Sequence, residues 1–305
     1  MKSSSDGISP AQRMLCTGLL FMASALALAD EQPRTAGPYV PTPQVIVDRM
    51  LQMAQVSAAD FVIDLGSGDG RMVRTAARVH GASGFGVDID AELVERSNAE
   101  ARREGIAAKA KFLQQDVFKA DIRKATVVTL YVLPNMMTSL RPKMLSELKP
   151  GTRIVSHDYH FREWLPDSRV ALDVPEKKEA VGFSSTSIYL WIVPAHVGGR
   201  WQLEVAGNKL AEPVTLALHQ SFQYVNGVAE VGSRKAELVN TRLKGDAFEF
   251  DFDASAKGGS ERHVYRGKVN GDTMEGEVAW GGGVAPRRYK WKATRIDTPR
   301  EPFAQ

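Results

Sequence analysis

The chain has 305 residues, enough for two domains, and an ordinary globular composition of 43% apolar and 25% charged residues. A formal net charge of +3 excludes a strongly basic nucleic-acid platform, so no nucleic-acid partner is expected. The only cysteine, Cys16, lies in an amino-terminal apolar run, and a chain cleaved after this run has no disulfide, cysteine nucleophile or thiolate metal site.

The amino terminus has the pattern of an export signal. Lys2 and Arg13 precede an apolar run over residues 14–29, and Ala27-Leu28-Ala29 fits the small-x-small rule for signal peptidase. The pattern predicts a signal peptide over residues 1–29 and a mature chain that begins at Asp30, is periplasmic and has no transmembrane segment. The alternative is an uncleaved membrane anchor, for which the run is short.

Residues 30–194 alternate between apolar strands and amphipathic helices. This alternation predicts an α/β domain with a Rossmann-like, mostly parallel seven-strand sheet covered by helices on both faces. A helix is expected after an N-cap at Thr42 followed by Pro43, and a helix broken by Pro134 and Pro142 is expected to resume near Arg141. The expected strands are 61–65, 84–87, 110–113, 126–133, 153–155, 170–174 and 187–193.

Residues 195–305 lack helical periodicity and contain short alternating strands. Turn signals such as Asn226-Gly227 separate several of them. We expect a C-terminal, all-β antiparallel domain folded as a barrel or a sandwich. The expected strands are 199–205, 214–225, 228–231, 236–243, 247–253, 262–269, 273–280 and 287–296.

A glycine-rich turn follows the first strand of the α/β domain. Asp64 precedes Gly66, Gly68 and Gly70, and the glycines allow positive φ angles and close approach of a ligand to the backbone. The N–H groups of the helix that starts after the turn attract polar or anionic ligand atoms. The spacing G-x-G-x-G differs from the dinucleotide fingerprint G-x-G-x-x-G, and the P-loop pattern is absent.

Two further acids follow the next strands. Asp88 ends the second strand about 20 residues after the turn, where an acid can bind the ribose hydroxyls of a nucleotide. Asp116 follows the third strand, where its carboxylate can accept a hydrogen bond from an exocyclic amine while Val117 packs on an adenine face. This order suits a nucleoside without phosphates, and S-adenosylmethionine is the obvious candidate.

The motifs resemble those of the class I, seven-strand S-adenosylmethionine-dependent methyltransferases. The closer resemblance is to the small protein-lysine methyltransferases typified by the mitochondrial enzymes that act on the c-ring protein of ATP synthase; the non-SET histone-lysine methyltransferases are more distantly similar. The resemblance covers about residues 38–194. It is carried by residues 38–42 (PYVPT), 64–71 (DLGSGDGR), 131–134 (YVLP) and 148–156 (LKPGTRIVS).

The resemblance implies methyl transfer from S-adenosylmethionine to a positioned nucleophile, first of all a protein lysine. Tyr39 and Thr42 would close over the cofactor, Tyr131 would line the methyl-transfer position, and His157 or Asp158 would take or relay the proton of an amine. The implied cofactor-binding residues are Tyr39, Thr42, Asp64, Gly66, Ser67, Gly68, Gly70, Asp88, Ile89, Asp116 and Val117.

Other functions stay open from the sequence. One is an exported, methyltransferase-like binding module that recognises an envelope partner, and another is a methyltransferase with a small-molecule acceptor. His157, Asp158 and His160 also permit a metal site, although no further ligand is evident, so no metal is expected.

Overall fold

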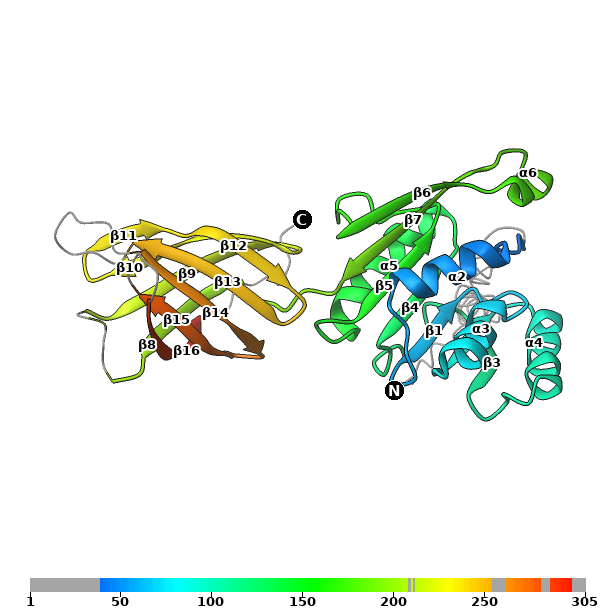
Figure 1. The fold of residues 1–305 in the computed structure, drawn as a ribbon, viewed down its shortest axis with the longest axis horizontal. Helices are drawn as coiled ribbons and strands as arrows, with labels where there is room; N and C mark the ends of the chain where they lie inside the picture. Colours follow the sequence, from blue (N-terminus) through cyan, green and yellow to red (C-terminus); the bar gives the residue numbers. More distant parts are fainter. Residues whose placement is uncertain (1–38, 208–209, 211, 254–261, 281–285, 298–305) are drawn as a thin grey trace, which may run out of the picture. The chain divides into compact units, whose positions relative to one another are not determined.

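The computed structural model describes residues 39–207, 210, 212–253, 262–280 and 286–297. The predicted signal peptide and the residues up to Pro38 lie outside this described part. The described residues form two β-sheets, of seven and nine strands, which we describe separately (Figure 1).

The seven-strand sheet confirms the predicted Rossmann-like fold. Its strand order is β3-β2-β1-β4-β5-β7-β6, and its pairs are parallel except that β7 runs antiparallel to both β5 and β6. The strands are β1 (Phe61–Leu65), β2 (Ser83–Asp88), β3 (Ala110–Gln114), β4 (Val127–Leu130), β5 (Arg153–His157), β6 (Ser168–Asp173) and β7 (Ser185–Ile192).

Helices cover both faces of this sheet because its central strands are apolar on both sides. On one face, Ile63 and Leu65 of β1 share a hydrophobic core with the buried side of α5. On the other face, Val62 shares a core with α2 and α3. The helices are α2 (Gln44–Met53), α3 (Arg71–His80), α4 (Ala91–Arg103), α5 (Pro134–Glu147) and α6 (Pro175–Val181).

The predicted break in the helix after β4 is wrong. α5 is continuous, with Pro134 in its first turn and Pro142 inside it. Proline in the first turn removes no helical hydrogen bond, whereas Pro142 costs roughly 3 kcal/mol. Burial of apolar side chains at about 1.5–3 kcal/mol each offsets this cost. The buried side chains of α5 are Met136, Met137, Leu140 and Met144.

Three other local predictions need correction near the carboxyl edge of the sheet. The cap of α2 is Pro43 and not Thr42, so the Thr42 hydroxyl is left for another contact. β4 ends at Leu130 and β5 extends to His157, which places Tyr131 just after a strand and His157 at the end of one. The short helix α6, between β6 and β7, was not predicted.

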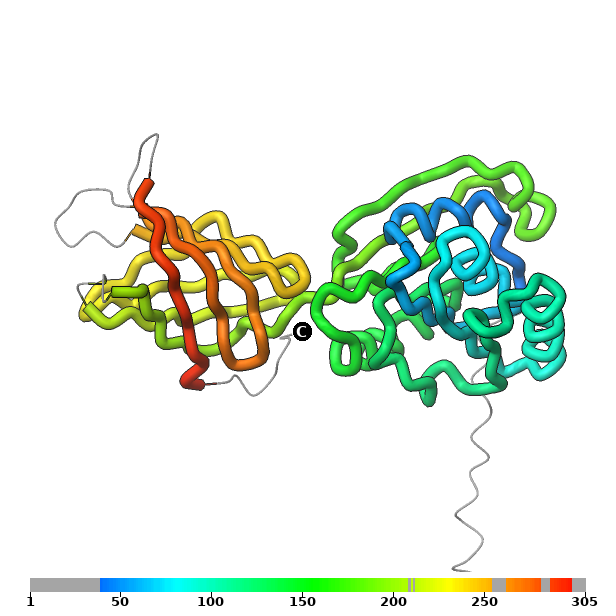
Figure 2. Tube along the Cα trace, turned by 60° about the horizontal axis from the view of Figure 1, so that its bottom comes forward, coloured from blue at the N-terminus to red at the C-terminus, as the bar shows by residue number. Residues whose placement is uncertain are grey.

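The nine-strand sheet is antiparallel and curls into a nearly closed barrel, as Figure 2 shows, in agreement with the predicted all-β fold. The last strand pairs with the first, in the order β11-β10-β9-β8-β16-β15-β14-β13-β12. The strands are β8 (Gly199–Val205), β9 (Val214–Ser221), β10 (Tyr224–Val231), β11 (Arg234–Glu237), β12 (Val239–Lys244), β13 (Ala247–Asp253), β14 (Arg262–Asn270), β15 (Thr273–Trp280) and β16 (Arg287–Asp297).

The interior of this sheet is filled by aliphatic and aromatic side chains, and the aromatic ones include Trp201, Tyr265 and Trp291. The predicted turn at Asn226-Gly227 is wrong, since both residues lie within β10 and pair with β9. The chain turns instead after Ser221, where Phe222 adopts a left-handed φ of 53°. The hairpin therefore divides the predicted strand 214–225.

Candidate functional site

Asp64 lies near the carboxyl end of β1, and its side chain is buried. Thr129 Oγ1, on the neighbouring strand β4, donates a hydrogen bond of 2.6 Å to Asp64 Oδ1. Burial raises the pKa of Asp64 to about 7, although the bond from Thr129 opposes the rise, and the charges of Asp88 and Asp69 add to it. The carboxyl group is thus poised for a cationic partner, since a positive ligand group would lower this pKa.

The glycine turn follows Asp64 and is held against β2. The amides of Gly66 and Ser67 both donate to the Val87 carbonyl at 2.9 Å. Gly66, Gly68 and Gly70 have φ angles of 86°, 52° and 76°, a region that favours glycine. A Cβ atom built on Gly68 would lie 2.5 Å from the Tyr39 ring, so the turn also needs glycine for close packing.

Asp88 lies at the end of β2 and contacts the glycine turn directly. Its Oδ2 atom accepts a hydrogen bond of 2.8 Å from the Gly68 amide, and its Oδ1 atom accepts one of 3.1 Å from Asp90. Asp90 in turn caps α4 through the amides of Glu92 and Leu93. The structure therefore brings two predicted site residues, Asp88 and Gly68, into contact.

The end of β3 lies beside the end of β2, where Gln115 donates to the Asp88 carbonyl at 2.9 Å. Asp116, the next residue, accepts a hydrogen bond of 2.9 Å from the Phe118 amide. Val117 is buried within the hydrophobic core, whereas Ile89 is exposed. Asp116 and Ile89 therefore keep surface for a ligand, while the Val117 side chain is largely used in packing.

Tyr39 and Thr42 belong to a segment, residues 39–43, that we call the strap. Arg71 holds the strap on the glycine turn: its guanidinium forms a two-pronged ion pair with Asp69 and donates to the Thr42 carbonyl at 2.7 Å. Burial and the negative charge of Asp69 raise the pKa of Tyr39. The sequence predicted the strap but not the Arg71–Asp69 pair that fixes it.

Tyr131 lies at the carboxyl end of β4, on the side of the sheet toward β5. Its ring packs on His157, with centroids 4.0 Å apart, and stacks with Tyr159 at 6.2 Å. Burial raises the pKa of Tyr131 to about 12, and the charges of Asp158 and Tyr159 contribute. The phenol therefore stays protonated at physiological pH.

His157 and Asp158 are close together, as predicted, and both are already engaged. Asp158 pairs with Lys177 of α6, a residue that the sequence patterns did not point to. Although burial alone would raise the pKa of Asp158, the hydrogen bonds that its carboxylate accepts from Lys177, from Thr186 and from the Ser187 amide hold it below its usual value. Burial lowers the pKa of His157, so its ring is neutral near pH 7.

His160 contacts the Tyr189 ring at 5.4 Å, and its Nδ1 atom accepts a hydrogen bond from the Arg162 amide. Across the described residues, no group of three or more histidine, cysteine, aspartate or glutamate side chains is arranged to hold a metal ion.

The residues at this edge fit S-adenosylmethionine, whose methionine part carries positive charge and whose ribose carries hydroxyl groups. The raised pKa of Asp64 marks a carboxyl group that a cation would stabilise in its charged form. The Ser67 hydroxyl is buried and has no hydrogen-bond partner within the described part of the chain. Glycine at position 68 lets the Tyr39 ring of the strap pack directly on the backbone of the turn, so the strap borders the site.

Comparisons with known proteins identify methyltransferases that are similar to this chain. Residues 64–168 match the family model of the ANTKMT methyltransferase domain. The chain is 39% identical over 160 residues to a protein-lysine N-methyltransferase of Saccharolobus islandicus, a match that covers 52% of this chain and 95% of the relative. It is 30% identical over 129 residues to the adenine nucleotide translocase lysine N-methyltransferase of Mus musculus, covering 42% of this chain and 56% of that protein.

Among solved structures, an RNA methyltransferase from Salinibacter ruber in complex with S-adenosyl-L-homocysteine is similar to this chain. The sequence identity is 46%, the TM-score is 0.46, and the match covers 50% of this chain and 93% of that one.

Proposed function

Because the chain belongs to the family of S-adenosylmethionine-dependent protein-lysine N-methyltransferases, we propose that its methyl acceptor is the side-chain amine of a protein lysine. The observation that carries the proposal is the 39% identity to the archaeal relative over 95% of that protein's length. The matched 160 residues correspond to about half of this chain, so the proposal concerns the seven-strand sheet and its site.

S-adenosylmethionine supplies an electrophilic methyl group on a sulfonium. Asp64 and the glycine turn would hold its charged methionine part, Asp88 would bind the ribose, and the strap would cover it. The strap and the turn are joined by Arg71, which donates to the Thr42 carbonyl. Positioning of this kind supplies most of the catalysis in a transfer between two bound groups.

The acceptor amine must be neutral when it attacks. Asp158, His157 and Tyr131 are the nearby residues that could take its proton. Asp158 is paired with Lys177, and the pKa of His157 is lowered by burial. Tyr131 keeps its proton because its pKa is about 12. These features favour positioning roles for the three residues, with the proton of the amine passing to water.

The experiment is label transfer from methyl-tritiated S-adenosylmethionine to fractionated cell-envelope extract. We expect label in the protein fraction, sensitive to protease and resistant to nuclease, and strongly reduced with Asp88→Ala when the cofactor concentration is below its dissociation constant. Label in the small-molecule fraction would support the small-molecule alternative. Intact S-adenosylhomocysteine binding with no label in any fraction would support a binding module.

We also propose that the protein is exported and periplasmic, from the pattern of residues 1–29. No helix within the described ranges is both long and apolar enough to cross a membrane. Amino-terminal sequencing of the protein recovered from its native cells should begin at Asp30. A start at Met1 in the cytoplasmic fraction would contradict export.

A further inference from the structure

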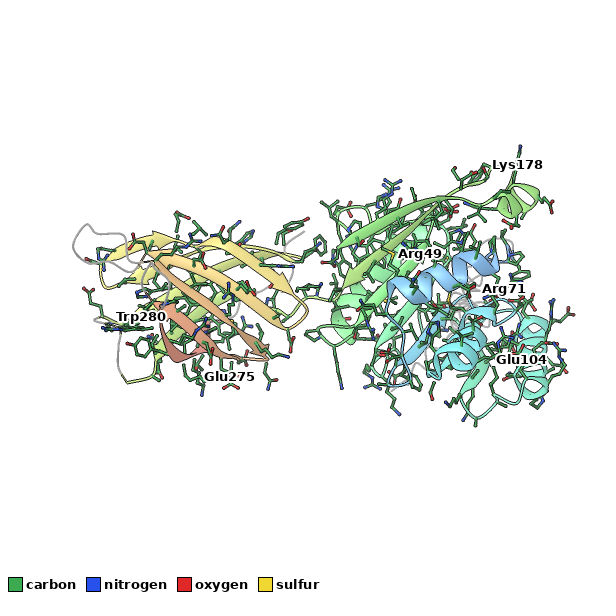
Figure 3. The ribbon with its side chains drawn as sticks, viewed as in Figure 1. Arg49, Arg71, Glu104, Lys178, Glu275 and Trp280 are labelled. Carbon is green, nitrogen blue, oxygen red and sulfur yellow. The ribbon has the colours of Figure 1, made fainter. Side chains whose placement is uncertain are left out.

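Lys177 has an environment unlike that of any ordinary surface lysine. Its side chain is only 2% exposed, and its Nζ atom pairs with Asp158 Oδ2. The same Nζ donates to the Ser185 carbonyl at 2.8 Å and lies 4.5 Å from the centroid of the Phe183 ring. The next residue of α6, Lys178, is exposed and projects away from the fold (Figure 3). Burial of an ammonium group is costly unless it is paired, so Lys177 is held in one place.

Asp158 connects Lys177 to a second residue, Thr186. Asp158 has a left-handed φ of 63°, an uncommon conformation for a residue other than glycine. While Oδ2 pairs with Lys177, Oδ1 accepts hydrogen bonds of 2.8 Å from Thr186 Oγ1 and 3.1 Å from the Ser187 amide. An ionised carboxylate only accepts, so the single proton of the Thr186 hydroxyl is directed at Asp158.

Because the Thr186 hydroxyl donates to Asp158, it also determines which ring nitrogen of His157 carries the proton. Thr186 Oγ1 lies 2.8 Å from His157 Nε2, and with its proton already used it can only accept from the ring. His157 therefore carries its proton on Nε2. Its Nδ1 atom is then an acceptor, and Thr42 Oγ1, 3.4 Å away, is the donor that faces it.

We propose that Lys177 is a positioning residue for the cofactor site: through Asp158 and Thr186 it fixes the Nε2–H tautomer of His157, which holds Thr42 of the strap. We call this series of contacts, from Lys177 through Asp158 and Thr186 to His157, the relay. The Tyr131 ring packs on His157, so the relay also reaches the side of the site where the acceptor would bind. The inference rests on the proposed function only in assuming that the site binds S-adenosylmethionine. It does not depend on the methyl acceptor, because S-adenosylhomocysteine binds without one.

The groups that face His157 predict what happens when Lys177 loses its charge. Burial lowers the pKa of His157 most, the carboxylate of Asp158 raises it, and the ammonium of Lys177 lowers it. Tyr131, packed on the ring, stays neutral near pH 7. With Lys177→Met, the carboxylate is unpaired and His157 takes up a proton at higher pH than before. A doubly protonated ring cannot accept from Thr42, so the strap loses this contact.

The test compares K177M with K178M, which removes an equal charge from the exposed position beside it. The imidazole ¹⁵N resonances report the tautomer and protonation of His157, and calorimetry reports S-adenosylhomocysteine affinity. In the wild type and K178M we expect a neutral Nε2–H ring from pH 6 to 8 and affinities within twofold of each other. In K177M, His157 should take up a proton at higher pH than in K178M, and affinity at pH 6 should fall at least fivefold and partly recover at pH 8.5.

A second variant removes the relay without leaving a buried charge unpaired. Thr186→Val keeps the side-chain shape and the Lys177–Asp158 pair, and we expect it to lose the fixed tautomer and at least threefold in affinity. The proposal is overturned if His157 keeps a neutral Nε2–H ring and affinity is unchanged in K177M or in T186V. If the wild type itself binds no S-adenosylhomocysteine, the proposed function fails, and the ¹⁵N comparison still decides whether the relay exists.

Discussion

Thr129 Oγ1 donates a 2.6 Å hydrogen bond to Asp64 Oδ1 between two central, parallel strands, and both side chains are buried. The pair lies at the carboxyl edge of the sheet, next to the glycine turn. A buried carboxyl group whose pKa is about 7 changes charge within the physiological range. The pair therefore links both the stability of the fold and its affinity for a charged ligand to pH.

The first prediction concerns stability without ligand. The folded pKa of Asp64, about 7, exceeds the unfolded value near 3.9, so this group stabilises the fold at low pH and loses that effect as pH rises from about 4 to 7. Asp64→Asn should raise the free energy of unfolding at pH 8, by on the order of 1–4 kcal/mol, and should change it little at pH 4. Urea unfolding at both pH values measures the difference, and an equal effect at pH 4 and 8 would refute the linkage.

The second prediction concerns the hydrogen bond from Thr129. Thr129→Val keeps the shape of the side chain but removes the bond that lowers the pKa of Asp64, so that pKa should rise further. S-adenosylhomocysteine affinity, which we expect to fall as Asp64 is protonated, should then begin to fall at a higher pH than in the wild type. Calorimetry from pH 6 to 9 gives the midpoint.

The matched control for this variant is Thr126→Val. Thr126 donates to Asp60, at the opposite end of the sheet, and has no contact with Asp64. It should lower stability and leave the pH midpoint of binding unchanged; a midpoint that moves equally in both variants would argue against a specific role for Thr129.

The third prediction concerns close packing at the glycine turn. Gly68→Ala places a methyl group 2.5 Å from the Tyr39 ring, whereas Gly105→Ala has a similar left-handed backbone and no atom within 4 Å. Both pay the cost of a positive φ, on the order of 1 kcal/mol. Only Gly68→Ala should displace the strap, with at least a tenfold loss of S-adenosylhomocysteine affinity. Equal affinity in the two variants would mean that the strap does not border the ligand.

The fourth prediction concerns Asp88. Its removal in Asp88→Ala takes away the acceptor for the Gly68 amide and the proposed ribose contact, so affinity should fall about 10- to 100-fold, or roughly 1.4–2.8 kcal/mol. Asp90→Ala removes the cap of α4 instead and should cost about 1 kcal/mol of stability. Its affinity should stay near that of the wild type. A comparable loss of affinity in Asp90→Ala would assign the effect to α4 and not to Asp88.

The parts of the site that lie within one turn or at strand ends could be predicted from the sequence. Asp64, the three glycines and Asp88 follow apolar strands directly, and parallel strands bring their carboxyl ends to one edge. Contacts between distant residues could not be predicted in this way. Thr129 contacts Asp64 because of the register between β1 and β4, and the sequence around Thr129 gives no indication of that register.

Lys177 is the clearest case of a residue that sequence reasoning misses. It lies in PEKKEAV, a seven-residue helix whose charged pattern is typical of an exposed segment, and its partner Asp158 is 19 residues away. The continuous helix α5 was missed for the opposite reason. Pro142 is a strong local signal for a break, and the burial of Met137, Leu140 and Met144 overrides it.

The most direct measurement identifies the methylated residue itself. Envelope protein labelled by the purified enzyme with methyl-tritiated S-adenosylmethionine, at a concentration below the dissociation constant, is hydrolysed to amino acids, with Asp88→Ala as the control of weakened cofactor binding. We predict that the label co-elutes with methylated lysine and is strongly reduced in the control. Label that co-elutes with another methylated amino acid, or that stays in a nucleotide or lipid fraction, would contradict a protein-lysine methyltransferase.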